Sequence, residues 1–433
     1  MKSIAKAVLA GTFLSAIVGA PSHASGEPAA APEGRAFGDG RVHVEKAFDF
    51  AGEQLARVAS STPVGSFPVF TDNRVAESTF GQWIKRTLPK PNFPDWRVGF
   101  FPGCLWLMYE FTGDRYWRDQ AQARTTELTY VQNDNTSHDV GFMTLPSFGN
   151  ALRLTGDPAN VPVLLRGADS LASRFNPLVG ATQSWSFGIP QSWTFPVIID
   201  NMMNIEILFW SAAHGGDPKH YDMAVSHALR TRQDHFRPDG STYHLVDYDP
   251  TTGQVIKKVT VQGFGNETTW ARGQAWAIHG FTIAYRYTHD PRMLETAERA
   301  ADYFIAHVAT GDWVPNWDFQ APAQFKQKDT SAAAIAASGL IELASFERRE
   351  HHAAWRFQTY KRSAERILSA LYRQYRAEGT PNSGILLHGT GNYPASYNSN
   401  NSQEIDIALI YGDYYFLQAL LRYEDLRDDR RER

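Results

Sequence analysis

The sequence has little of several features on which common protein classes depend. Cys104 is the only cysteine, so an intrachain disulfide is excluded, and its apolar neighbours predict a small buried side chain. The 14 histidines show no His-Glu-x-x-His spacing, and one cysteine cannot form a thiolate cluster, so no metal or other cofactor is implied. Gly-rich phosphate loops and Gly-x-Ser-x-Gly elbows are also absent, which leaves nucleotide use and serine hydrolysis unsupported.

The chain also lacks an excess of positive charge. Its 433 residues include 42 Lys and Arg against 46 Asp and Glu, and the net charge of −4 makes nucleic acid an unexpected partner. Aromatic residues are plentiful, with 12 Trp, 18 Tyr and 26 Phe. Their flat faces suit either core packing or stacking against sugar rings, and composition alone does not choose between these uses.

The N-terminus has the pattern of a secretory signal. Two lysines precede an apolar stretch from Ala7 to Ala20, and Ser22-His23-Ala24 supplies a small-residue cleavage site. The stretch is shorter than the roughly 20 residues that a membrane-spanning helix needs, and no later segment is apolar enough to span a membrane. We therefore expect cleavage after residue 24 and a mature protein in the periplasm or outside the cell.

Four segments organise the rest of the chain in this interpretation. Residues 1–24 are the signal, residues 25–40 a disordered leader, residues 41–425 one folded domain and residues 426–433 a charged tail. Nothing in the sequence indicates the oligomeric state.

A helical hairpin repeats along the folded domain. Four apolar runs end in short breaks, each finishing in Asp and followed by a more polar run: Thr112-Gly113-Asp114, Thr155-Gly156-Asp157, Gly215-Gly216-Asp217 and Thr288-His289-Asp290. Gly suits the left-handed cap after a helix and Asp suits the N-cap of the next, so the breaks predict helix-to-helix turns. With two similar runs further on, six inner helices are expected over 101–111, 145–154, 205–213, 274–287, 331–346 and 407–421.

Six inner helices alternating with outer ones predict an all-α fold, the (α/α)6 barrel. An open solenoid would show a more uniform period than the spacings of 43, 60 and 73 residues between successive Asp breaks. Strand signals are sparse, and residues 243–248 and 255–261 on either side of a Pro-Thr-Thr-Gly turn predict one small β-hairpin.

In such a barrel, residues just before the inner helices are expected to form one site. Inner helices that run in the same direction bring their N-terminal ends together, and carboxylates, indoles and an arginine stand there. They are Trp96 with Arg97, His138 with Asp139, Asp200 with Asn201, Trp270 with Arg272, Asp329 to Ser331, and Glu404 with Asp406. Indoles stack on sugar faces and a carboxylic acid can donate a proton, so this composition is typical of a carbohydrate site.

Asp200 is the strongest candidate for an acid, although an Asp before a helix is most often an N-cap. Its flanks, Pro196 to Ile199 and Met202 to Ile205, are apolar, and burial would raise its pKa. Asp139 is the second candidate, and His244 on the predicted hairpin could reach over the site. Asp329 is expected to be a plain cap and Asp413 a structural hydrogen-bonding group.

Long blocks of sequence resemble the unsaturated glucuronyl hydrolases, glycoside hydrolase family eighty-eight. In order along residues 40 to 425 these blocks are DWRVGFFPGCLWLMYEFTGD from Asp95, SHDVGF from Ser137, IIDNMMNIEILFW from Ile198, STYH from Ser241, TWARGQAWAIHGF from Thr269 and YGDYYFLQALLR from Tyr411. The resemblance implies an (α/α)6 barrel that removes the 4,5-unsaturated uronic acid left at the non-reducing end by polysaccharide lyases. The implied chemistry is hydration of a vinyl ether, and the implied partner is an unsaturated uronyl oligosaccharide.

Residue roles carry over by motif. Asp200 falls on the proton donor and water-activating base, and Asp139 on its carboxylate partner. Substrate-contacting positions are implied for Trp96, His138, His244, Gln262, Trp270, Arg272, Trp276 and Tyr393. The loop from Thr390 to Ser402 departs from the family pattern, because it is long, rich in Asn and Ser, and has no Lys or Arg.

Two other functions fit the same observations. One is an unsaturated rhamnogalacturonyl hydrolase with the same barrel acting on pectin fragments, although the sequences of the blocks resemble the glucuronyl family more closely. The other is a periplasmic sugar-binding protein whose Asp residues only hydrogen-bond hydroxyl groups. Loss of the substrate double bond on incubation distinguishes an enzyme from a binding protein.

Overall fold

The computed structural model describes residues 42–74, 77–87, 95–187, 189, 192–351, 353–398 and 404–428. The chain divides into residues 1–39 and 40–433, and every described residue belongs to the second unit. The predicted signal and leader lie outside the described residues, as do residues 399–402 of the predicted loop and 429–433 of the predicted tail.

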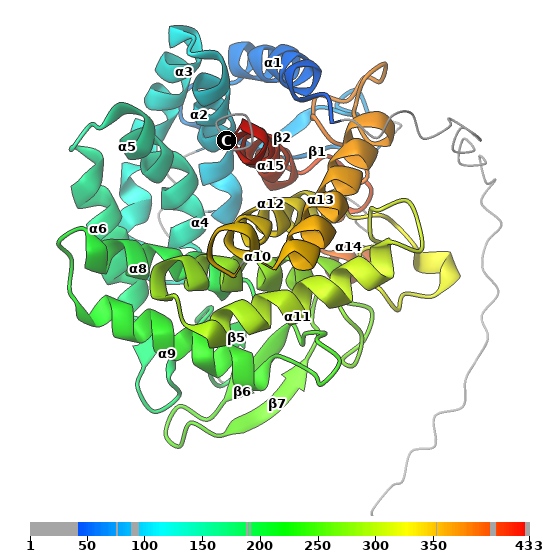
Figure 1. Cartoon of the computed structure of the whole chain (residues 1–433). Coiled ribbons are helices and arrows are strands. Elements are labelled where there is room, and N and C mark those ends of the chain that lie inside the picture. Colours follow the sequence, from blue (N-terminus) through cyan, green and yellow to red (C-terminus); the bar gives the residue numbers. More distant parts are fainter. Residues whose placement is uncertain are drawn as a thin grey trace, which may run out of the picture. The chain divides into compact units, whose positions relative to one another are not determined.

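Six helical segments of the described chain form an inner ring (Figure 1). They are α2 (Phe100–Thr112), the succession α4 (Val140–Thr144), η3 (Leu145–Gly149) and α5 (Asn150–Thr155), the pair α7 (Asn201–Asn204) and α8 (Glu206–Ala213), α10 (Ala271–Thr288), α12 (Thr330–Phe346) and α15 (Ile410–Asp428). Each predicted apolar run overlaps one of these segments, which confirms the six inner helices. α15 continues three residues into the segment predicted as tail.

A proline explains why the second inner segment starts earlier than predicted. The prediction began this helix at Leu145, whereas the structure begins it at Val140, directly after Asp139. Pro146 has no N–H to donate, and the chain passes it through a π-helical turn over Leu145–Gly149. The Asn150 side chain donates to the Pro146 carbonyl at 3.0 Å and so satisfies an acceptor at this turn.

The outer ring consists of more polar helices. They are α1 (Val44–Ser61), α3 (Arg115–Glu127), α6 (Asn160–Ala172), α9 (Lys219–Asp234), α11 (Pro291–Val308) and α13 (Ala354–Gln374). The predicted turns are confirmed: the Asp114 and Asp290 side chains accept from backbone N–H groups at 2.8 and 2.9 Å, and Gly113 ends α2 at a φ of 68°.

The ring is closed, not open. α15 packs against α2 as well as against α12, so the last inner helix contacts the first. Large side chains such as Trp106 and Trp276 fill the interior and have no exposed surface. This closure confirms the barrel over the solenoid.

The described chain holds more strand than the single hairpin expected. The hairpin is present as β6 (Leu245–Tyr248) and β7 (Val255–Val259), but β5 (Pro196–Ile198) joins it on the other side of β6. Two further antiparallel pairs are β1 (Ser66–Thr71) with β2 (Trp83–Thr87), and β3 (Phe175–Asn176) with β4 (Ala181–Thr182). β1 is buried on both faces, and such a run lacks the alternation by which a strand is recognised in sequence.

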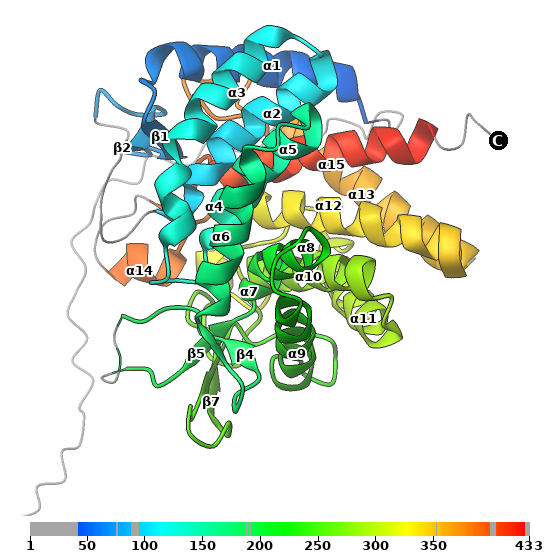
Figure 2. The same ribbon diagram turned by 90° about the vertical axis from the view of Figure 1, so that its left-hand side faces the viewer.

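One end of the barrel carries most of the irregular structure. Figure 2 shows β1, β2, β5, β7 and the short helix α14 (Tyr393–Asn398) on the side where the inner helices begin, and the end of α15 on the opposite side. The remaining short helices are η1 (Trp96–Gly99), η2 (Thr129–Asn133), η4 (Ala323–Phe325) and η5 (Glu347–His351). We call the end where the inner helices begin the mouth.

A glycine brings two inner helices into direct contact near the mouth. A Cβ atom on Gly141 would lie 2.7 Å from the Cα of Asn204, which is closer than a real Cβ can approach. The Asn204 side chain accepts from the Phe142 N–H at 2.7 Å. α4 and α7 therefore touch close to their starts, and the residues just before them, Asp139 and Asp200, become neighbours.

Candidate active site

The predicted site residues stand where inner helices begin. Asp139, Asp200, Trp270 and Asp329 directly precede α4, α7, α10 and α12. Because these helices run in the same direction, the four positions meet at the mouth, as the sequence predicted.

Hydrogen bonding separates two of these carboxylates from ordinary helix caps. Asp329 accepts from the Ser331 N–H at 3.1 Å and Asp114 from the Tyr116 N–H, as N-caps do. Asp139 and Asp200 occupy the same position before their helices, yet neither side chain makes a capping hydrogen bond. The capping interpretation that the sequence left open for Asp200 is therefore wrong.

A backbone frame holds the segments that carry these carboxylates. The Ser184 carbonyl accepts from the His138 N–H at 2.8 Å, and the Ser184 N–H donates to the Pro196 carbonyl at 2.8 Å. The Ser184 hydroxyl accepts from the Ile198 N–H at 2.9 Å. One residue thus links the strand that leads to Asp200 with the segment that leads to Asp139.

Asp200 lies in an environment that favours its neutral form. Its side chain is 14% exposed; burial and, to a smaller extent, the negative charge of Asp139 raise its pKa, His138 and Arg272 lower it, and the net value is about 6. Its Oδ2 atom is buried and has no hydrogen-bond partner in the described residues. A carboxyl that titrates near neutrality and has a free oxygen at the mouth can donate a proton to a bound ligand.

His244 faces this free oxygen. It directly precedes β6, and its Nε2 atom lies 3.7 Å from Oδ2 of Asp200. The Gln262 N–H donates to Nδ1 of His244 at 3.2 Å, and burial lowers the histidine pKa to about 3. The neutral ring therefore accepts at Nδ1 and carries its proton on Nε2, directed at Asp200.

His138 and Asp139 form the second polar pair at the mouth. Nε2 of His138 lies 3.3 Å from Oδ1 of Asp139, whose side chain is 20% exposed. The two carboxylates are close enough, as predicted, for the negative charge of Asp139 to raise the pKa of Asp200.

Arg272 anchors the mouth instead of projecting freely. Its guanidinium donates to Asp329 at 2.7 Å, to the Thr390 carbonyl at 2.6 Å and to the Gly391 carbonyl. It also lies 4.5 Å from the Trp270 ring. Asp329 is thus a cap, as predicted, and in addition the counter-ion of this arginine, a role that its sequence position does not indicate.

The indoles expected to contact substrate differ in depth. Trp96 is partly exposed and packs against Phe142 and Tyr411 at 5.2 and 4.8 Å between ring centroids. Trp270 packs against His244 at 4.6 Å. Trp276 is fully buried between Phe142 and Tyr415, so it lies beneath the other two along the barrel interior.

Gln262 and Tyr393, which came from the resemblance alone, also lie beside the mouth. Gln262 holds His244 through its backbone N–H, and its Oε1 atom is buried without a hydrogen-bond partner in the described residues. Tyr393 begins α14 two residues after Gly391 and stacks on Trp317 at 4.3 Å. The structure therefore brings all ten predicted site residues to one end of the barrel or directly beneath it.

Ser184 and Tyr411 are site residues that sequence reasoning missed. Ser184 acts through its backbone and hydroxyl, and no motif marks such a residue. Tyr411 packs on Trp96 and lies 5.3 Å from the Arg272 guanidinium. It stands at the start of a block that the family resemblance highlighted, and that position was the available signal.

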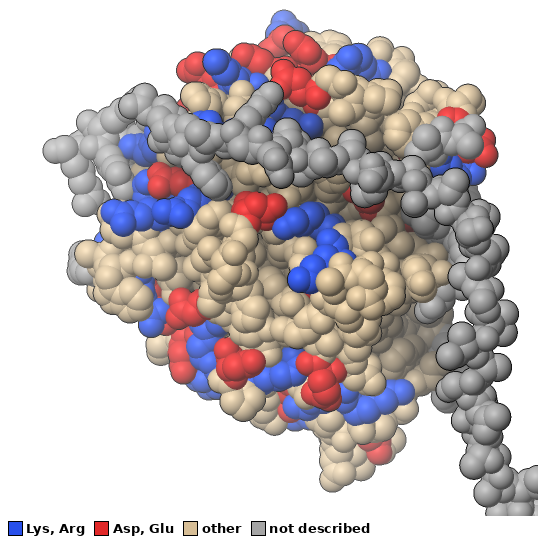
Figure 3. Space-filling view, turned by 90° about the vertical axis from the view of Figure 1, so that its right-hand side faces the viewer, with Lys and Arg blue, Asp and Glu red and all other residues tan. Residues whose placement is uncertain are grey.

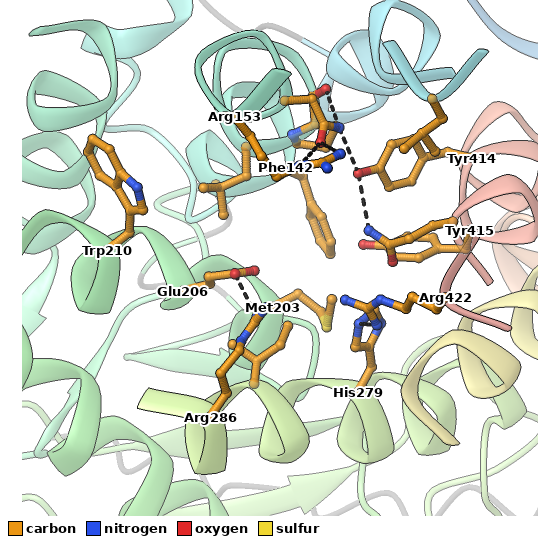
Figure 4. Close-up of a pocket in the computed structure, with 18 of the residues that line it drawn as sticks. Phe142, Arg153, Met203, Glu206, Trp210, His279, Arg286, Tyr414, Tyr415 and Arg422 are labelled. Atoms are coloured by element: carbon orange, nitrogen blue, oxygen red, sulfur yellow. Dashed lines mark hydrogen bonds and ion pairs between the residues drawn. The ribbon is translucent and has the colours of Figure 1, made fainter. Parts of the chain in front are cut away.

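A cavity of about 600 Å³ lies at the other end of the barrel (Figure 4). Its charged side chains come from the later parts of the inner helices, and Arg286 pairs with Glu206 at 2.8 Å. Arg422 pairs with Glu342 at 3.0 Å. These charges are paired with one another, and the cavity is separate from the carboxylates at the mouth.

Two findings concern metals and membranes. Across the described ranges, no three or more His, Cys, Asp or Glu side chains are grouped so as to hold a metal ion. Within the same part of the chain, no helix is both long and apolar enough to cross a membrane.

On the face shown in Figure 3, positive and negative side chains are interspersed.

Sequence comparison relates the chain to known hydrolases. The profile of Glycosyl Hydrolase Family 88 matches residues 71–424. An unsaturated glucuronyl hydrolase of Formosa agariphila is 39% identical over 368 residues, which cover 83% of this chain and 87% of the relative. An unsaturated chondroitin disaccharide hydrolase of Streptococcus pyogenes is 32% identical over 336 residues, covering 76% of this chain and 81% of the relative.

Structural comparison agrees. A crystal structure of an unsaturated glucuronyl hydrolase specific for heparin has a TM-score of 0.79 at 38% identity, covering 89% of this chain and 98% of the other. That of the unsaturated glucuronyl hydrolase from Bacillus sp. GL1 also has a TM-score of 0.79, at 32% identity, with 88% of this chain and 97% of the other covered.

Proposed function

The chain belongs to glycosyl hydrolase family 88, and on this premise we propose that Asp200 is the acid with which it removes 4,5-unsaturated uronic acid from oligosaccharide ends. The activity is that of a glycoside hydrolase acting on unsaturated uronyl oligosaccharides, the products of polysaccharide lyases. The roles of individual residues, the parent polysaccharide and the location are our proposals.

Asp200 carries out the proton transfers in this proposal. Its carboxyl group gives a proton to C4 of the C4=C5 double bond, and the positive charge that develops at C5 is shared with the ring oxygen. The Asp200 carboxylate then takes a proton from water as the water oxygen bonds to C5. The resulting hemiketal opens as its C5–O bond to the ring oxygen breaks, which leaves a C5 ketone and a hemiacetal at C1. The hemiacetal then collapses to an aldehyde: its hydroxyl group loses a proton, the leaving sugar's oxygen gains one, and both products are released.

The neighbouring groups prepare Asp200 for both steps. Asp139 raises the pKa of Asp200, so that more of the acid is protonated near neutral pH. The Nε2–H of His244, 3.7 Å from Oδ2 of Asp200, provides a donor for the substrate or for the incoming water. Trp96, which is partly exposed, offers a face on which the planar unsaturated ring can lie.

One observation carries the proposal. Two carboxylates stand at helix starts without capping them. One of these has a pKa of about 6 and a buried oxygen that has no hydrogen-bond partner among the described residues and faces a histidine donor. A site that only bound sugar hydroxyl groups would have no need of a carboxyl group held near its titration point.

The test is loss of the double bond. Purified protein lacking residues 1–24 should bleach the ultraviolet absorbance of unsaturated uronyl disaccharides from at least one lyase digest of chondroitin, heparin, hyaluronan, pectin or ulvan. Relatives named for heparin and chondroitin substrates favour a glycosaminoglycan digest. Protein that binds these disaccharides without bleaching any of them would contradict the proposal.

We also propose that the mature protein acts in the periplasm or outside the cell. The support is the signal-like pattern of residues 1–24 with its cleavage site after Ala24. Lyase products are formed where polysaccharide is degraded, and an exported hydrolase would meet them there.

A further inference from the structure

A row of aromatic side chains leads from the interior of the mouth to its surface. Trp317 is buried and stacks on Tyr393 at 4.3 Å with ring planes 8° apart. Tyr393 stacks in turn on Tyr397 at 5.7 Å and 16°. Phe325 packs edge-on against both tyrosines, at 6.2 and 5.8 Å, and Phe264 packs on Phe325 at 5.9 Å.

The outer members of this row are exposed. Tyr397 has 56% and Phe264 44% of its surface accessible. A single exposed aromatic side chain is common on soluble proteins. Here two of them flank Phe325, whose edge contacts both tyrosines, and the three form one continuous apolar surface, which we call the aromatic wall: Phe264, Phe325 and Tyr397.

The wall is built on the residues that hold the catalytic groups. Gln262, which binds His244, is two residues before Phe264. The Thr390 and Gly391 carbonyls, which Arg272 holds, lead directly into α14, where Tyr393 and Tyr397 share one helix face.

Buried groups fix the wall in place. The Trp317 indole N–H donates to the Phe325 carbonyl at 2.6 Å while its ring supports Tyr393. The buried carboxylate of Asp318 accepts from the Phe264 N–H at 2.9 Å and from the Thr268 hydroxyl at 2.6 Å. Ordered, exposed aromatic faces lose little conformational entropy on binding, which favours a binding role.

We propose that the aromatic wall binds a sugar ring of the substrate that lies beyond the sugar bonded to the unsaturated uronate. This inference rests on the proposed function, because the substrate is an oligosaccharide whose reducing-end part must leave the mouth along its rim. A pyranose has an apolar face that stacks on aromatic rings, while its hydroxyl groups reach polar side chains at the rim. Gln324 and Lys326, exposed on either side of Phe325, can serve these hydroxyl groups.

The proposal predicts a dependence on chain length. The wild-type protein should have a higher kcat/KM for an unsaturated tetrasaccharide than for the disaccharide of the same digest. Tyr397→Ala should lower kcat/KM for the tetrasaccharide by about 3- to 10-fold, the range expected from one stacking contact, and leave the disaccharide value unchanged. Phe264→Ala should have the same selective effect.

Trp355→Ala is the matched control, because Trp355 is 63% exposed on the outer helix α13. This variant should leave kcat/KM unchanged for both the disaccharide and the tetrasaccharide. An equal loss on both substrates in Tyr397→Ala would mean that Tyr397 only supports Tyr393, and no loss on either would mean that no sugar rests there; both results overturn the wall as a subsite. A wild-type protein that bleaches no disaccharide would instead overturn the proposed function, and the wall with it.

Discussion

Replacing Asp200 by Asn separates chemistry from stability in a single variant. The amide has nearly the shape of the carboxyl group but has no proton to give, so turnover should fall by about 10²- to 10⁴-fold, the usual range for a lost acid–base group. The folded state should nevertheless gain stability, because the wild-type carboxyl group is buried where its ionised form is disfavoured.

The size and sign of this gain follow from the pKa. Asp200 titrates at about 6 in the folded protein against 3.8 for an ordinary Asp, which corresponds to about 3 kcal/mol at 1.36 kcal/mol for each pH unit. Below pH 3.8 the group is protonated in both states and has no effect. Between pH 4 and 6 the unfolded chain ionises first and the folded state loses stability, and above pH 6 the full cost remains.

Urea unfolding of both proteins at pH 4 and pH 7.5 measures this. Asp200→Asn should exceed the wild-type free energy of unfolding by less than about 1 kcal/mol at pH 4 and by up to about 3 kcal/mol at pH 7.5. Asp114→Asn is the control, because Asp114 is a true cap and Asn caps equally well, so turnover and stability should both stay near wild type. Retained turnover in Asp200→Asn, or lower stability than wild type at pH 7.5, would refute the reasoning.

Four further predictions concern two site residues, a metal requirement and export. Asp139→Asn should reduce turnover severely. The wild-type rate is expected to fall above about pH 6, where Asp200 ionises, and in this variant the fall should move to lower pH because the charge that raises the pKa of Asp200 is removed. A profile of kcat against pH measures this shift, and an unchanged profile would contradict it. Arg272→Lys should raise KM by about 10-fold with a smaller change in kcat, since one ammonium cannot hold Asp329 and the Gly391 carbonyl together; unchanged kinetics would show that this anchor is dispensable. Turnover should survive treatment with a chelator, and a loss restored by added metal would reveal a metal requirement. Mass spectrometry of secreted or periplasmic protein should find an N-terminus directly after Ala24, and an intact Met1 on membrane-bound material would argue against export.

Repeating patterns made the barrel predictable. The four Asp breaks mark real turns, and the apolar runs mark the inner helices, because helix termini and core faces depend on local sequence. The small sheets were harder to predict, since β3 and β4 have only two residues each and β5 pairs with β6 almost 50 residues further along the chain.

The site divides in the same way. The burial of Asp200 could be predicted because its apolar flanks are local, and this burial raises its pKa. The role of Ser184 could not be predicted, because its hydrogen bonds form only when residues 138, 184 and 196 come together in the fold. Trp276 and Trp96 look alike in sequence, and only the packing of Phe142 between them shows that one is partly exposed and the other fully buried.

Closure of the ring between α15 and α2 has a consequence for how the protein folds. These helices lie about 300 residues apart in the chain, and contacts of such long range form slowly because a large loop must close first. Until α15 joins, α2 and α12 each leave one apolar side uncovered, which favours aggregation. A chain truncated before Ile410 should therefore be recovered as insoluble protein, and refolding of the full chain should be slow and improve with dilution.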